Sequence, residues 1–232
     1  MRNRLNVWLH ATLMAVVVMS LGGCAASWQQ VSTKRPFKGP SRAYVVNLPD
    51  QWKRAPTDDT DHLVLTREGL YLQQIRLLRY PLKQAFPVVE QSRSMTPEAW
   101  ADLLPEELAD WQYKQLKAGV NPAMVVRKEE LKGILAAFQP QDAKPSDATT
   151  AQIRMDPAVL DGRPVFELET RSFNTWGLEY RTLTYGFVHE KAWWLLQYSA
   201  PSLLYFERDL PTFEAFKSSL KIKESCFLFC SD

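Results

Sequence analysis

Seven segments between residues 42 and 223 have the apolar and polar pattern of strands, and in residues 70–80 apolar and polar positions alternate. Such patterns bounded by turn signals indicate strands. Short links such as Asp161-Gly162 predict antiparallel pairing of the last four strands, and a slip in the alternation at Gln73-Gln74 indicates a β-bulge. The expected strands are 43–48, 62–67, 70–80, 151–159, 164–173, 178–188 and 192–200.

Two other segments have the apolar spacing of amphipathic helices. Thr96, an N-cap residue followed by a proline, begins a helix that is expected to restart at Pro105 and to end at Gly119. A second helix is expected over about residues 210–220. Its buried face should carry Leu210, Phe213, Phe216 and Leu220.

Two adjacent tryptophans in the last expected strand indicate how the sheet is covered. Neighbouring residues of a strand point to opposite faces, so Trp193 and Trp194 place apolar bulk on both faces. In a sheet with one solvent-exposed face, apolar and polar residues would alternate along the strand instead. The sequence therefore predicts an α+β domain, an antiparallel sheet with helices packed on it and partly covered on both faces.

The N-terminus has the pattern of a bacterial lipoprotein signal. A basic start and an apolar run over residues 5–21 lead to Leu21-Gly22-Gly23-Cys24, which resembles a lipobox. The resemblance implies cleavage before Cys24 and acylation of its thiol and new amino group, so that membrane lipid holds the protein. Ala25 in place of Asp implies the outer membrane, with the protein facing the periplasm. A plain secretory signal with a coincidental cysteine is the alternative.

The segment after the cysteine, residues 24–41, has no strand or helix period, which predicts a flexible tether. No acidic residue occurs from Cys24 to Pro49. Basic side chains beside a lipid anchor could face anionic headgroups. A solvated linker that its charges keep extended is the alternative. The membrane-proximal basic residues are Lys34, Arg35, Lys38 and Arg42.

Composition and charge exclude some classes of protein. With 46% hydrophobic and 23% charged residues, the chain is an ordinary globular one. Arg2 and Arg4 account for the net charge of +2, because without them the 28 basic side chains fall to 26, equal to the 26 acidic ones. A neutral body argues against a nucleic-acid partner.

The domain resembles the Mog1/PsbP-like α/β domains of many bacterial envelope proteins. The resemblance rests on a first strand that ends in Leu48-Pro49-Asp50 before Trp52, on Tyr198-Ser199-Ala200-Pro201, and on the helix segment 213–220. It implies an α/β/α sandwich. Because members act mainly as binding or assembly factors, it also implies a non-enzymatic role.

Motifs for phosphate loops, Gly-x-Ser-x-Gly nucleophiles and His-Glu-x-x-His metal sites do not occur in the sequence. Asp58-Asp59-Thr60-Asp61-His62 could hold a hard cation but lacks the rest of a calcium loop, so a solvated loop is expected. Glu167 and Glu169 share a strand face, which superficially suggests an acid–base pair. Exposed ion pairs with Arg171 and Arg181 are the expected use.

Aromatic residues of the second half are expected to pack in the core, with a ligand groove as the alternative. No catalytic residue, metal ion or cofactor is expected. The aromatic residues are Trp176, Tyr180, Tyr185, Trp193 and Tyr198.

Cys226 and Cys230 are the thiols that remain once Cys24 is acylated, and an oxidising periplasm favours a disulfide between them. Their spacing fits a disulfide only in a turn or helical coil, because an extended strand holds them too far apart. Two free or intermolecularly paired thiols are the alternative.

These patterns divide the chain into a signal peptide (1–23), a lipidated cysteine and tether (24–41), a single domain (42–223) and a tail (224–232). The first functional hypothesis is a non-enzymatic lipoprotein that binds or scaffolds an envelope partner. The second is a module with a small-ligand or lipid pocket between sheet and helix. The third is an enzyme of unrecognised type, which needs a cleft where carboxylates or a histidine converge; His62 and His189 far apart would leave it without the usual base.

Overall fold

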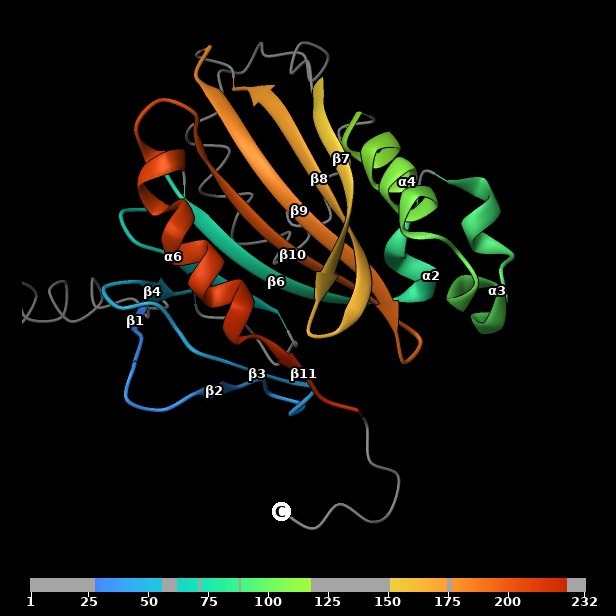
Figure 1. Ribbon diagram of the computed structural model, residues 1–232, viewed down its shortest axis with the longest axis horizontal. Helices are drawn as coiled ribbons and strands as arrows, with labels where there is room; N and C mark the ends of the chain where they lie inside the picture. Colours follow the sequence, from blue (N-terminus) through green and yellow to red (C-terminus); the bar gives the residue numbers. More distant parts are fainter. Residues whose placement is uncertain are drawn as a thin grey trace, which may run out of the picture.

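A large antiparallel sheet dominates the computed structural model, which describes residues 28–55, 62–70, 72–87, 89–117, 151–174 and 177–224. Its eight strands follow the order β1-β4-β5-β6-β10-β9-β8-β7 (Figure 1). The expected α+β class is therefore confirmed. The strands are β1 (Gln29–Gln30), β4 (Lys53–Arg54), β5 (Leu63–Thr66), β6 (Gln74–Pro81), β7 (Ala151–Leu160), β8 (Arg163–Phe173), β9 (Glu179–His189) and β10 (Ala192–Pro201).

One face of this sheet is covered by the last helix and by a second, smaller sheet. Helix α6 (Tyr205–Ser219) runs into β11 (Lys221–Ile222), which pairs with β3 (Tyr44–Val46), itself paired with β2 (Phe37–Lys38). Tyr44 meets Trp194 of the large sheet edge-on, with ring centroids 6.2 Å apart. These elements enclose one hydrophobic core.

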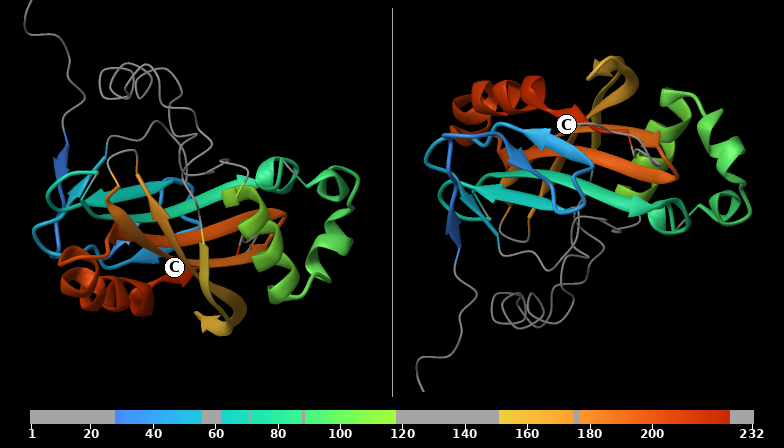
Figure 2. Two further views of the ribbon diagram at one scale, coloured as in Figure 1. Left: turned by 90° about the horizontal axis from the view of Figure 1, so that it is seen from above. Right: turned by 90° about the horizontal axis from the view of Figure 1, so that it is seen from below.

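The other face carries the helices between β6 and β7. They are α2 (Leu82–Ala85), the 3₁₀ turn η1 (Glu90–Arg93), α3 (Pro97–Ala101) and α4 (Pro105–Lys117). Phe86, Trp100 and Trp111 from this group form a second core with Trp193 of β10. Figures 1 and 2 show α6 and these helices with the sheet between them. The inference of two covered faces from Trp193 and Trp194 is confirmed.

The predicted tether is shorter than expected. Two strands lie inside it, because Gln29 pairs with Arg54 at the edge of the large sheet and Phe37 pairs with Val46 in the small one. Each of these strands has only two residues, so neither leaves a periodic pattern in the sequence. The strands that the structure describes therefore start well before the predicted boundary at residue 42.

Two further expectations were wrong in detail. The slip at Gln73-Gln74 is not a bulge: β6 begins at Gln74, and Gln73 belongs to the turn before it, where its N–H donates to Gly69 O. Helix α6 begins five residues before Leu210, because Phe206 is fully buried and extends the apolar face.

Within the described residues, no helix is both long and apolar enough to span a membrane.

Candidate functional site

Two exposed leucines project where the chain passes from β10 to α6. We term residues Pro201–Tyr205 the β10–α6 corner. Leu203 exposes 82% of its surface and Leu204 exposes 67%. A single exposed leucine is common on protein surfaces, but two adjacent ones at a turn form an apolar projection.

The backbone of this corner is strained. Leu204 has φ 74° and ψ −54°, and Tyr205 N–H donates to Leu203 O at 3.0 Å, which closes a γ-turn of the rarer kind. Apart from glycines, Leu204 is the one apolar residue with positive φ among the described residues. Such a conformation costs about 1–3 kcal/mol and persists only where the surroundings impose it.

Tyr198 in β10 supplies one of these constraints. Its hydroxyl donates to the carbonyl oxygens of Tyr205 at 3.1 Å and of Phe206 at 2.9 Å. Burial, with the nearby carboxylate of Asp209, raises the pKa of the Tyr198 hydroxyl above its usual value. The hydroxyl therefore stays protonated at neutral pH and remains a donor to the start of α6.

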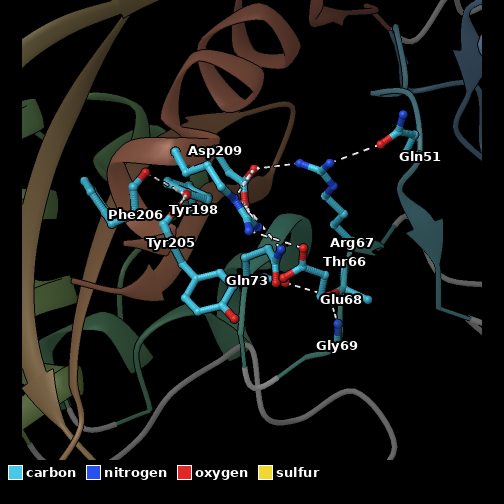
Figure 3. Close-up of polar contacts among 11 residues, drawn as sticks. Gln51, Thr66, Arg67, Glu68, Gly69, Gln73, Tyr198, Tyr205, Phe206 and Asp209 are labelled. Carbon is cyan, nitrogen blue, oxygen red and sulfur yellow. Dashed lines mark hydrogen bonds and ion pairs between the residues drawn. The ribbon is translucent and has the colours of Figure 1, made fainter. Parts of the chain in front are cut away.

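Asp209 in the first turns of α6 supplies the second constraint (Figure 3). Its side chain is buried, with a relative exposure of 1% for the residue. Its carboxylate accepts hydrogen bonds from Arg67 at 3.3 Å, Arg208 at 2.7 Å and Gln73 at 3.2 Å. Since Arg67 and Gln73 flank the β5–β6 turn, the carboxylate ties α6 to that turn.

The arginines of this cluster also reach outward. Arg67 donates to Gln51 at 3.1 Å, and Arg208 lies 3.2 Å from Glu68 and over the ring of Tyr205. Each charge of the cluster thus has a partner within the protein. The arrangement therefore suits a rigid support for the two leucines rather than a site that exchanges protons with a substrate.

A neighbouring strand end extends the apolar surface. Ser202 N–H donates to Glu179 O at 2.9 Å, which places the corner beside the start of β9. There Leu178 is 39% exposed, as is Phe173 at the end of β8. The strand ends and the corner together make this end of the sheet a candidate protein-binding surface.

The structure brings together three of the four basic residues singled out in the sequence. Lys34, Arg35 and Lys38 line one hollow of about 580 Å³, to which Arg54 adds a fourth positive charge. Arg42 does not line it and lies in a turn with φ 58°. Cys24, Cys226, Cys230, Trp176 and the acidic segment 58–61 lie outside the described residues.

The glutamate pair forms ion pairs as expected, but only the pair of Glu167 with Arg154 is exposed. Glu169 is buried and accepts hydrogen bonds from Arg181, and Glu167 accepts one from the Tyr185 hydroxyl at 2.6 Å and another from Arg154. The burial follows from α6, which lies over this face of the sheet. Arg171 pairs instead with Glu179, at 3.7 Å.

The space that a ligand pocket between sheet and helix would need is filled. Phe206, Phe213 and Phe216 of α6 are at most 2% exposed, and Tyr185 and Tyr198 pack against Phe213. Core packing of the aromatic residues is therefore confirmed for Tyr185, Trp193 and Tyr198, which are all buried, whereas Tyr180 is half-buried.

The two histidines of the third hypothesis do not converge. His62 precedes β5 and His189 ends β9, with β6 and β10 between these strands. Three strand spacings amount to about 14 Å. Burial, with a contribution from Arg163, lowers the pKa of His189. Within the described ranges, no three His, Cys, Asp or Glu side chains are placed to share a metal ion.

Sequence reasoning missed the corner and the buried carboxylate behind it. Asp209 falls between Phe206 and Phe213 at helical spacing, so the sequence does place an acid on the apolar face of α6. Leu203 and Leu204 follow the helix-breaking Pro201, where a surface turn is expected to be polar. These two departures from the usual pattern were the available signals.

Comparison with known proteins gives likeness of fold only. No family model matches the chain, and no curated protein matches its sequence. A protein from Bacteroides thetaiotaomicron has TM-score 0.46 at 7% identity, covering 84% of this chain; this chain spans 50% of its length. The cyanobacterial PsbP of Synechocystis has TM-score 0.49 at 13% identity, covering 87% of this chain and 96% of its own.

A third similar structure is LpqN, described as involved in cell envelope biogenesis of Mycobacterium tuberculosis. It has TM-score 0.40 at 12% identity and covers 82% of this chain and 90% of its own. PsbP is one of the two proteins that give the expected fold its name. At these identities and TM-scores, the similar structures carry no information on the function of this chain.

Proposed function

We propose that this protein is a lipoprotein of a Gram-negative cell envelope that binds a protein partner through the β10–α6 corner and catalyses no reaction. Lipid on Cys24 anchors it in the outer membrane, facing the periplasm. The anchor is supported by the signal segment and by Leu21-Gly22-Gly23-Cys24.

One observation carries the binding role: an exposed leucine pair is held in a strained turn by buried polar groups. Leu204 could adopt an easier backbone conformation if Tyr198 and Asp209 did not fix the start of α6. Strain that the surroundings impose is concentrated at functional sites. A partner with an apolar groove would cover the two leucines, as anchor residues do at protein interfaces.

Site-specific crosslinking tests the binding role in intact cells. A photo-crosslinking amino acid at position 203 should capture one defined protein, and Leu204→Ser in the same chain should abolish the capture. Position 104 is the matched control, because Leu104 is also exposed, at 61%, but lies between α3 and α4. Equal capture from both positions would contradict the proposal.

Fractionation tests the anchor separately. Cys24→Ala should leave the domain folded but release it from tight membrane association, because the acyl chains proposed on this residue would be the anchor. Intact mass of the native protein should show the added acyl chains. A variant that stays firmly in the membrane after signal cleavage would contradict the lipidation.

A further inference from the structure

The hollow beside β1 concentrates positive charge without compensation. Lys34, Arg35, Lys38 and Arg54 line it, and no carboxylate does among the described residues. Lys34, Arg35 and Lys38 are exposed. Uncompensated cations around a hollow attract an anion of matching size.

Strand residues anchor part of the hollow in the fold, whereas Lys34 and Arg35 lie in the connection between β1 and β2. Arg54 belongs to β4, donates a hydrogen bond to Gln29 of β1, and lies over the Phe37 ring at 5.1 Å from its centroid. Phe37 in turn pairs with Val46 in the small sheet. The Arg54 guanidinium is therefore fixed, and Lys34 and Lys38 line the same hollow.

The position of the hollow along the chain selects its ligand. Gln29 and Gln30 line it, and four residues lie between Cys24 and Gln29, so that the five steps along the chain reach at most about 18 Å. If lipid anchors Cys24, the hollow cannot move far from the bilayer surface. Anionic headgroups attract basic residues near the surface by about 1 kcal/mol each.

We propose that this hollow binds the phosphate of an anionic phospholipid in the membrane that holds the anchor. The contact would fix the orientation of the domain, with β1 and β2 against the headgroups. The orientation rests on the lipidation proposed above, whereas the phosphate site rests on the residues of the hollow.

Lysine footprinting tests this site on the full-length protein purified from membranes. The protein is placed in vesicles of phosphatidylcholine, with or without phosphatidylglycerol, and labelled with an amine-reactive reagent. Lys34 and Lys38 should react several-fold more slowly when phosphatidylglycerol is present, and high salt should remove the difference. Lys83 on α2 and Lys117 on α4 are exposed controls that should react equally in both vesicles.

A variant and a soluble ligand sharpen the test. Arg35→Gln should remove most of the protection of Lys34, whereas the matched Lys83→Gln should not. Both side chains are exposed, so the fold should tolerate either change. Equal labelling in both vesicles would overturn the proposal, and so would equal protection by glycerol phosphate in detergent, which would assign the hollow to a free phosphate compound.

Failure of the anchor and failure of the site give different results. Intact mass shows whether Cys24 carries lipid. A protein without lipid contradicts the anchor, but vesicles added to it in solution still protect Lys34 and Lys38 if the hollow binds the headgroup. If the protein is lipidated but its lysines react equally in both vesicles, the result supports the anchor and contradicts the phosphate site.

Discussion

The β7–β8 hairpin and the β10–α6 corner both turn the chain tightly at the surface, but with opposite kinds of residue. The hairpin turns through Asp161 and Gly162, with φ 50° and 75°, residue types that tolerate positive φ. The corner turns through Leu203 and Leu204, and Leu204 has φ 74°. Leucine has no conformational reason to be there, which indicates that its side chain serves another purpose.

The supporting contacts differ in the same way. At the hairpin, the Asp161 carboxylate accepts hydrogen bonds from Ile222 N–H at 2.8 Å and from Lys221 and Arg163, so the turn residue itself stabilises the fold. At the corner, Tyr198 and Asp209 hold the backbone, while the leucine side chains point into solvent. The hairpin residue therefore contributes to the stability of the fold, whereas the two corner leucines remain exposed.

The largest expected effect is that of Phe216→Ala, which weakens the support common to both turns. Phe216 is 2% exposed in the core beneath α6, so its loss should lower the free energy of unfolding by about 3–5 kcal/mol. Denaturant unfolding measures this change. Both turns should become less protected from hydrogen exchange to the same degree, and a melting temperature equal to that of the wild type would contradict the burial of this face.

Asp209→Ala should destabilise the β10–α6 corner more than the β7–β8 hairpin. It removes the acceptor of hydrogen bonds from three side chains and leaves the buried amide of Gln73 unpaired, a loss of about 2–3 kcal/mol. Hydrogen exchange should rise at Tyr205 and Phe206 more than at Gly162. Asp209→Asn is the matched control, since it keeps an acceptor and should cost less; equal loss of protection at both turns would show that Asp209 does not support the corner specifically.

Asp161→Asn should weaken the hairpin in a pH-dependent way. Burial alone would raise the pKa of Asp161, but the Ile222 N–H, Lys221 and Arg163 together lower it. A lowered pKa gives stability that is present above the ordinary value of about 3.9 and is lost as pH falls through the folded-state value. The variant should therefore be about 1 kcal/mol less stable at pH 7, with no difference in strong acid. A difference in unfolding free energy that stays constant with pH would exclude the charge of Asp161 as its cause.

Replacing Leu204 of the corner by glycine should stabilise the protein, whereas replacing Gly162 of the hairpin by alanine should destabilise it. Leu204→Gly relieves the strained backbone and should raise the free energy of unfolding by about 1 kcal/mol, after the greater flexibility of glycine in the unfolded chain is counted. Gly162→Ala should lower it by about 1 kcal/mol through backbone strain alone, because a Cβ there meets no atom within 4 Å. Paired unfolding curves measure both changes, and a loss of stability in Leu204→Gly would mean that the leucine is structural.

The sequence predicted the parts of this molecule that repeat a pattern. The long strands β7–β10 followed from strand-like segments joined by short turns, and the covering of both faces followed from Trp193 and Trp194. The two-residue strands β1 and β2 could not be predicted, because two residues have no period. The corner was missed because the strained turn depends on the contacts of Asp209 with Arg67 and Gln73, which lie 142 and 136 residues away in the sequence.

The basic residues, too, could be predicted only in part from the sequence. A run without acids predicted that Lys34, Arg35, Lys38 and Arg42 would act together. The hollow instead includes Arg54, sixteen residues after Lys38, because β4 pairs with β1, and it excludes Arg42. Only the pairing of distant strands decides which charges share a site.

If a partner binds the leucines of the corner, the protein keeps them at the expense of stability. Crosslinking from position 203 in intact cells should therefore be compared between chains with Leu204 and with Leu204→Gly, and the unfolding free energies of the same two chains should be measured in parallel. We expect the glycine variant to be the more stable chain and to capture its partner several-fold less. A glycine variant that is more stable and captures the partner equally well would contradict this expectation.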